Sequence, residues 1–154
     1  MARLCLNLLL IIFVKGSEMT DVATALLINS DGELLILKRS SKVSTYKGLW
    51  AGISGYVEEN EMPYQTAIKE IKEEVRIDEK DIVFIKELGP ISFKDTYNGK
   101  QYHWNIFIFL FKTEKKDKIH IDWEHSEYRW VPPSHVEKYD TVPHFKDVVS
   151  ELLL

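Results

Sequence analysis

Cysteine is almost absent from this sequence. The chain of 154 residues contains one, Cys5. A single cysteine cannot form a disulfide within the chain, and it cannot build a site in which several thiolates hold a metal, so both classes of structure are excluded. So little cysteine is typical of proteins from a reducing compartment, and we expect a cytoplasmic location.

Positive charge is also in short supply. There are 20 Lys and Arg residues against 24 Asp and Glu residues, which gives a formal net charge of −4. The chain therefore lacks the basic footprint of a protein that binds a nucleic-acid polymer, and we expect no such partner. A small anionic substrate would have to be received through a metal ion and a few local basic side chains.

Long apolar runs are limited to the N-terminus. The run from Leu4 to Val14 is too short to span a bilayer, so we expect no stable membrane span. Residues 1–18 have three interpretations: sequence upstream of a true start at Met19, an extra strand or helix packed on the domain, or a signal for export or membrane attachment. Internal repeats and low-complexity linkers are missing too, and the length leaves room for one domain, which we place at residues 19–154.

The most distinctive stretch runs from Gly55 to Ile77. Pro63 suits the first turn of a helix, because the N–H that proline lacks would have no partner there. Nothing between Pro63 and Val75 breaks a helix. The stretch therefore predicts a turn with acidic residues that leads into a helix.

Three glutamates lie close together on this helix. Glu70, Glu73 and Glu74 stand at i, i+3 and i+4, which places their Cβ atoms within about 5–6 Å of one another. Ionised carboxylates at this spacing repel each other, and a hard divalent cation such as Mg²⁺ or Mn²⁺ removes the repulsion. The alternative is a solvated helix face with Lys–Glu pairs, which is typical of a run such as KEIKEE.

The spacing of the whole stretch resembles the Nudix box, G-x5-E-x7-R-E-U-x-E-E-x-G-U, in which U is a bulky aliphatic residue. The chain matches this pattern at Gly55, Glu61, Glu70, Ile71, Glu73, Glu74 and Ile77. Two positions depart from it. Lys69 replaces an arginine whose planar fork would orient the first glutamate, so we expect a looser Lys69–Glu61 pair. Arg76 replaces a glycine that normally ends the helix in a left-handed conformation, which favours a shifted helix end.

The resemblance implies roles for the matched residues. Glu70, Glu73 and Glu74 would hold Mg²⁺ or Mn²⁺, and Glu70 or Glu73 would take a proton from the attacking water. Gly55 would offer its carbonyl oxygen to a metal ion. Glu61, together with Lys69, would serve catalysis by positioning the helix.

Nudix enzymes commonly add an acidic residue from a loop late in the chain. The segment from Trp123 to Val131 offers Glu124, Glu127 and His125, and Glu124 is the first choice as an additional metal ligand. A surface loop with incidental acids is the alternative.

A small basic patch surrounds Arg39, at the end of an expected strand over residues 33–39. Arg39 is the candidate for contact with substrate phosphates, and an ordinary solvated loop is the alternative.

The resemblance also implies the fold, an α/β/α sandwich with a mixed sheet between helices. We expect strands at residues 22–28, 33–39, 82–88 and 101–113, with Asn98-Gly99 as a hairpin turn. The box helix should cover one face of the sheet and a helix within residues 144–154 the other.

The implied activity is metal-dependent hydrolysis of a pyrophosphate bond in a nucleoside diphosphate derivative. Nucleoside triphosphates and oxidised nucleotides lead as substrates, and ADP-ribose is a minority option. The alternative function is a nucleotide-binding or regulatory Nudix domain without hydrolysis. The oligomeric state stays open: Nudix proteins often pair, and the apolar first strands offer one surface for a homodimer.

Overall fold

The computed structural model describes residues 19–154, and the three interpretations of residues 1–18 lie outside this range. In chain order the strands and helices are β1 (Thr20–Ile28), β2 (Leu34–Arg39), β3 (Trp50–Ala51), β4 (Ile53–Tyr56), α2 (Pro63–Val75), η1 (Glu79–Asp81), β5 (Ile82–Tyr97), β6 (Lys100–Thr113), η2 (Lys116–Lys118), β7 (His125–Val131), η3 (Pro133–Lys138) and α3 (Phe145–Leu153). No helix within this range is long and apolar enough to cross a membrane.

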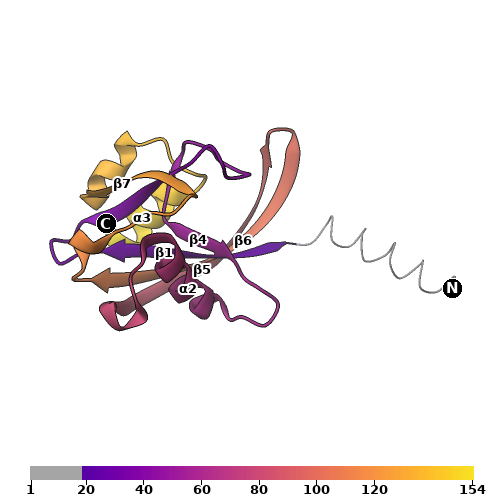
Figure 1. Ribbon diagram of the computed structural model, residues 1–154. Coiled ribbons are helices and arrows are strands. Elements are labelled where there is room, and N and C mark those ends of the chain that lie inside the picture. Colours follow the sequence, from indigo (N-terminus) through magenta and orange to yellow (C-terminus); the bar gives the residue numbers. More distant parts are fainter. Residues whose placement is uncertain (1–18) are drawn as a thin grey trace, which may run out of the picture.

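The strands form one mixed sheet of seven strands, in the order β3-β2-β1-β6-β5, with β4 paired to β1 and β7 paired to β2 (Figure 1). β1 runs parallel to β6 and antiparallel to β2 and β4. β1 therefore lies inside the sheet, with neighbours on both sides. β1 has no free edge, and among the described strands β5 ends the order on one side.

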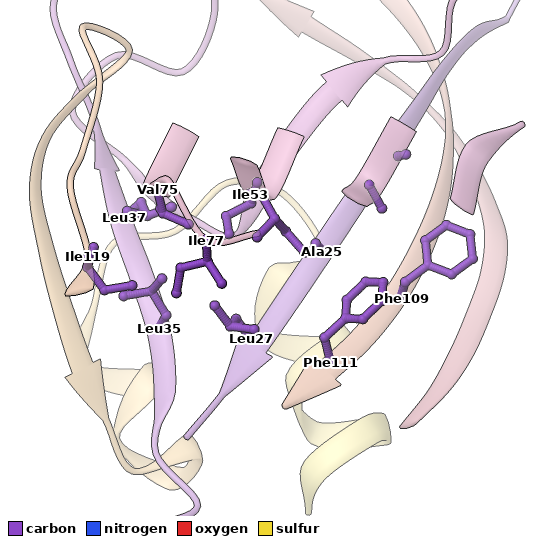
Figure 2. Close-up of a cluster of buried hydrophobic side chains, with 13 residues drawn as sticks. Ala25, Leu27, Leu35, Leu37, Ile53, Val75, Ile77, Phe109, Phe111 and Ile119 are labelled. Carbon is purple, nitrogen blue, oxygen red and sulfur yellow. The ribbon is translucent and has the colours of Figure 1, made fainter. Parts of the chain in front are cut away.

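The two faces of the sheet are covered by different helices. Neighbouring residues of β1 point to opposite faces, so Leu27 packs with Ile71 and Val75 of α2, whereas Leu26 packs with Val149 of α3. Figure 2 shows the α2 side, where side chains from several strands meet those of the helix end. The predicted α/β/α sandwich is confirmed.

Helix α2 begins at Pro63 and ends at Val75, as the sequence predicts. The side chain of Gln65 accepts a hydrogen bond from the backbone N–H of Met62 at 3.2 Å, which supports the first turn. At the other end Arg76 itself adopts the left-handed conformation, with φ of 61°. The expected shift of the helix end is therefore wrong. Arg76 adopts the left-handed conformation itself, although glycine would adopt it at a lower energetic cost.

Strands β5 and β6 form a hairpin that projects from the rest of the sheet (Figure 1). Asn98 and Gly99 both have positive φ, 50° and 78°, which confirms the predicted turn. The strand expected to end at Leu88 instead continues through an irregular step at Gly89-Pro90 to Tyr97. The extended hairpin forms one wall of the cavity described below.

Candidate active site

Gly55 lies on β4, directly opposite Ala23 of β1 in the sheet. Its Cα faces the carboxyl group of Glu70 on α2, and a Cβ at this position would collide with that carboxyl group. The close approach of strand and helix therefore requires glycine here. It also brings the backbone of β4 beside the first glutamate of the helix.

The three neighbouring glutamates of α2 lie in three different environments. Glu74 is fully buried, with 1% of its surface exposed, Glu70 is half-buried, and Glu73 is exposed. Glu70 and Glu73 line a cavity whose lining also includes Phe145 and Val148 of α3. The predicted cluster therefore exists, and it extends from solvent into the core.

Burial has a large effect on the inner carboxyl groups. Burial, and then the charge of Glu73, raises the pKa of Glu70 to about 7. Burial also raises the pKa of Glu74 well above its ordinary value, with Glu124 and Glu70 adding to the effect. Within residues 19–154, Oε2 of Glu74 has no hydrogen-bond partner although it is buried. These carboxyl groups are desolvated without enough donors to compensate for the lost water.

Glu124 is brought to the same cavity from the loop before β7. Its backbone carbonyl accepts a hydrogen bond from Ser40 N–H at 2.7 Å, and Ser40 Oγ donates to the carbonyl of Trp123 at 2.8 Å. Burial, followed by the charge of Asp122, raises the pKa of Glu124, and the positive charge of Arg39 opposes the shift. Glu124 is thus near the box glutamates although it is distant in sequence.

The two other candidates in this segment lie elsewhere. Glu127 forms an ion pair with Arg129, at 2.8 Å from Nη2, on the surface. His125 points inward, with Nε2 at 3.4 Å from Oε1 of Glu74 and Nδ1 at 3.2 Å from Oδ1 of Asp122. Burial lowers the pKa of His125, and Asp122 opposes this. His125 therefore contacts a box glutamate from behind and does not line the cavity.

Arg39 lines the cavity beside Glu124. Its Nε donates to the carbonyl of Thr45 at 2.9 Å, and Nη2 donates to Oγ1 of the same residue at 3.3 Å. Burial lowers its pKa, and the charge of Glu124 opposes the shift. A freely solvated loop residue would have no such contacts, so the structure favours the interpretation of Arg39 as a fixed positive charge in the cavity.

Glu61 and Lys69 form the expected ion pair. Oε2 of Glu61 also accepts a hydrogen bond from Oγ1 of Thr66 at 2.7 Å. The hydrogen bond from Lys69 is the largest cause of a lowered pKa at Glu61. Neither residue lines the cavity. This pair ties the loop before α2 to the helix.

The cavity has a volume of about 490 Å³. Its lining includes the carboxyl groups of Glu70, Glu73 and Glu124 together with apolar side chains, among them Phe93 and Trp104 of the hairpin. Two other aromatic residues of the hairpin lie outside the cavity lining: Tyr102 stacks on Trp104 with ring centres 4.9 Å apart, and Tyr97 packs on Tyr46.

Tyr46, from the loop between β2 and β3, closes this wall. Its hydroxyl group donates to the Asp95 carboxylate and accepts from Nε1 of Trp104 at 3.1 Å. Burial is the main cause of a raised pKa at Tyr46. Nothing in the sequence around Tyr46 indicates these contacts, since its partners come from a hairpin far along the chain.

The residues present suit a divalent cation, although they are not preorganised for one. In the described part of the chain, no three His, Cys, Asp or Glu side chains have the geometry of a metal site. Glu70 and Glu74 lie close enough for each carboxyl group to affect the pKa of the other. A cation would offset the repulsion between their charges and would supply a partner for the orphaned oxygen of Glu74. Hard oxygen donors of this kind fit Mg²⁺ and Mn²⁺.

Comparison with known proteins gives consistent matches. The family model described as NUDIX domain matches residues 19–152. Over 121 residues the chain is 26% identical to the nucleoside triphosphatase NudI of Escherichia coli O139:H28, which covers 74% of this chain and 83% of the relative.

Solved structures agree on the fold. An Ap4A hydrolase from C. elegans superposes with a TM-score of 0.69 at 20% identity, covering 86% of this chain and 94% of that one. The MutT protein from Methanosarcina mazei Go1 superposes with a TM-score of 0.67 at 24% identity, covering 86% and 91%.

Proposed function

Since this chain belongs to the NUDIX domain family and is a Nudix-type pyrophosphohydrolase, we propose that it hydrolyses a pyrophosphate bond in a nucleoside triphosphate or an oxidised nucleotide. The observation that carries the proposal is the cavity itself. Carboxyl groups of Glu70, Glu73 and Glu124 and aromatic side chains of Phe93 and Trp104 line the same cavity. This combination suits a ligand that carries both a polyphosphate and a flat base.

Nudix hydrolases act with divalent metal ions, and we propose Mg²⁺ or Mn²⁺ for this chain. When bound, such an ion neutralises the diphosphate and activates water for attack. Glu70, Glu73, Glu74 and Glu124 would hold it, together with the carbonyl oxygen of Gly55.

Glu70 and Glu73 are the two candidates for the residue that accepts the proton of the attacking water. The pKa of Glu70, raised to about 7, lies near neutral pH, where a general base is most effective. Glu73 is exposed and lines the cavity, so a water molecule bound there can reach it. Either residue would pass the proton to solvent after the bond breaks.

The rest of the cavity would bind the substrate. Arg39, fixed by Thr45, offers a positive charge to a phosphate group. Trp104 and Phe93 offer apolar rings against which a nucleobase can pack. The positioning pair of Glu61 and Lys69 keeps the helix in register with β4.

The similarity to NudI, named a nucleoside triphosphatase, favours triphosphates as the first class to test. ADP-ribose stays a minority option. The alternative function, nucleotide binding without hydrolysis, is typical of chains that have lost box glutamates. All four of them, Glu61, Glu70, Glu73 and Glu74, are present here.

The test is a substrate screen. Nucleoside triphosphates, their 8-oxo forms, ADP-ribose, nucleotide sugars and dinucleoside polyphosphates are incubated with Mg²⁺, with Mn²⁺ and with a chelator, and release of phosphate or pyrophosphate is followed. We expect one class to be hydrolysed in a chelator-sensitive way. Binding of a nucleotide by calorimetry without turnover of any compound would favour the binding-module alternative.

A substitution tests the site. Glu73→Gln keeps the shape of the side chain and removes its charge, so we expect turnover to fall by several decades, roughly 4 kcal/mol or more in the barrier. Glu151→Gln, on the exposed face of α3, is the matched control and should behave as wild type. Wild-type turnover in Glu73→Gln would remove Glu73 from the site.

We also propose that residues 19–154 fold as the catalytic domain and that the protein is cytoplasmic.

We further propose that the protein forms a homodimer through the outer strand β5. Val83, Phe84 and Ile85 of this strand are 65%, 43% and 43% exposed. Mass measurement by light scattering tests this: Val83→Lys should yield monomers, and a monomeric wild type would exclude the dimer.

A further inference from the structure

Behind the carboxyl cluster lies a buried chain of three polar side chains. Glu74 contacts Nε2 of His125 through Oε1 at 3.4 Å, and Nδ1 of His125 lies 3.2 Å from Oδ1 of Asp122. The side chains of Glu74 and His125 are 2% and 1% exposed, whereas that of Asp122 is 21% exposed. The imidazole is thus fixed between a carboxyl group of the box helix and one of the loop before β7.

Asp122 also organises the turn that carries Glu124. The same oxygen, Oδ1, accepts a hydrogen bond from the backbone N–H of Glu124 at 3.1 Å. The backbone N–H of His125 donates to the carbonyl of Asp122 at 3.3 Å, which closes the turn. One carboxyl group therefore fixes both the histidine behind Glu74 and the backbone of Glu124.

From this geometry we propose that His125 is a positioning residue, which holds Glu74 and the Glu124 turn in the arrangement that binds a divalent cation. The inference rests on the proposed function only in that Glu74 and Glu124 are taken as metal ligands. His125 itself does not line the cavity. It acts through Glu74 and Asp122, the two carboxyl groups that it contacts.

The physical argument starts from Glu74. This carboxyl group is buried, and its Oε2 has no partner within the described residues, so only contacts at Oε1 restrain its orientation. A rigid ring at Oε1 leaves Oε2 as the atom available to a cation. Without the ring, the carboxyl group of Glu74 would lose this restraint and would be free to rotate. Groups that orient a ligand from behind typically change metal affinity by about 10–100-fold.

Two substitutions separate the two halves of this chain. The amide nitrogen of asparagine occupies roughly the place of Nδ1 of histidine, and that of glutamine roughly the place of Nε2. His125→Asn therefore keeps the contact with Asp122 and loses the one with Glu74. His125→Gln keeps the contact with Glu74 and loses the one with Asp122. His135→Asn, on the exposed surface of η3, is the matched control.

The readout is Mn²⁺ binding to the protein without nucleotide, followed by electron paramagnetic resonance. We expect His125→Asn to weaken Mn²⁺ binding by about 10-fold or more, and His125→Gln by no more than about 3-fold. In turnover, His125→Asn should raise the Mn²⁺ concentration needed for half-maximal rate while leaving the rate at saturating Mn²⁺ within a few-fold of wild type.

Equal affinities of the asparagine variant and the wild type would overturn the inference. So would equal losses in both variants that follow their losses in thermal stability, because a purely structural role would affect them alike. If His125→Asn fails to fold by circular dichroism, Asp122→Ala replaces it, and Mn²⁺ binding unchanged in that variant would overturn the inference. A wild type that binds Mn²⁺ but hydrolyses no nucleotide removes the proposed function and leaves the role of His125 testable. A wild type that binds no Mn²⁺ removes this inference directly.

Discussion

The two ends of helix α2 differ in whether their carboxyl groups have partners. At its start, Glu61 is fully paired, with Lys69 on one oxygen and the hydroxyl of Thr66 on the other. Near its end, Glu70 and Glu74 are desolvated, repelled by neighbouring carboxyl groups and left with an unpartnered oxygen. Helix α2 and the loop that precedes it thus carry both a satisfied and an unsatisfied charge cluster.

The paired charges at the start of the helix stabilise it, whereas we propose that the unpaired carboxyl groups near its end serve ligand binding. A paired charge lowers the free energy of the folded chain without any ligand. An unpaired buried carboxylate raises it, and such a group is tolerated where a ligand or a cation compensates. Activity should therefore depend most on the end that costs stability, and the predictions below test this separation.

Among the changes that compare the two ends of the helix, the largest effect should come from Glu70→Gln. This change removes the charge that the cavity needs, so we expect turnover to fall about 10³-fold, roughly 4 kcal/mol in the barrier. In chelator at pH 8 the same variant should be more stable than wild type, because the repelled carboxylate is gone. Turnover and urea unfolding, measured on one preparation, check the expected loss of activity and the expected gain of stability. A variant that lost activity and stability together would contradict the comparison.

The stability of the metal-free protein should depend on pH in a defined window. The pKa of Glu70 is about 7 in the folded chain and 4.5 in the unfolded chain, so between these values the folded state binds more protons. Stability should therefore fall as pH rises from about 4.5 to about 7. Because Glu70 is only half-buried, solvent screening reduces the effect to on the order of 1–2 kcal/mol. Urea unfolding in chelator measures it, and Glu70→Gln should show a flatter profile. Identical profiles would show that Glu70 does not cause it.

A smaller effect is expected at the satisfied end of α2. Glu61→Gln removes the ion pair with Lys69 but keeps an acceptor for Thr66. The helix should therefore still form, and the preceding loop should be held less firmly against it. We expect turnover to fall about tenfold, with little change in Mn²⁺ affinity. Lys69→Met, which also removes the pair, should show the same loss. A fall as large as that of Glu70→Gln would place Glu61 among the ligands.

The smallest effect should come from Arg76→Gly. Glycine adopts the left-handed conformation of this position, φ 61°, at less cost than arginine, so stability should rise by about 0.5–1 kcal/mol. Turnover should not change, because Arg76 lies beyond the cavity. Thermal unfolding provides the measurement. A loss of stability would show that the arginine side chain compensates for the strained backbone.

The parts of this structure that sequence predicts well are local. The bounds of α2 follow from Pro63 and from an unbroken helical stretch, and the turn at Asn98-Gly99 follows from the dipeptide itself. The length of β5 does not, because Gly89-Pro90 has the composition of a strand end. Only the continued pairing with β6 shows that the strand extends beyond it.

The site divides in the same way. The box glutamates and Gly55 are set by spacing along one segment, and the structure places Glu70, Glu73 and Gly55 around the cavity. The relation of Asp122 to His125, and that of Tyr46 to the hairpin, depends on tertiary packing between distant segments. No local pattern encodes such contacts.

The parallel pairing of β1 with β6 has a consequence for biosynthesis. Thr20 lies opposite Trp104 and Ile28 opposite Lys112. The central strand β1 therefore stays without its partner β6 until late in synthesis. Pairing over so long a separation in sequence is slow to form, and a nascent chain keeps the apolar residues of β1 uncovered meanwhile. A ribosome-bound chain that stops before residue 104 should therefore be open to proteases and chaperones, and protection should appear once β6 has emerged.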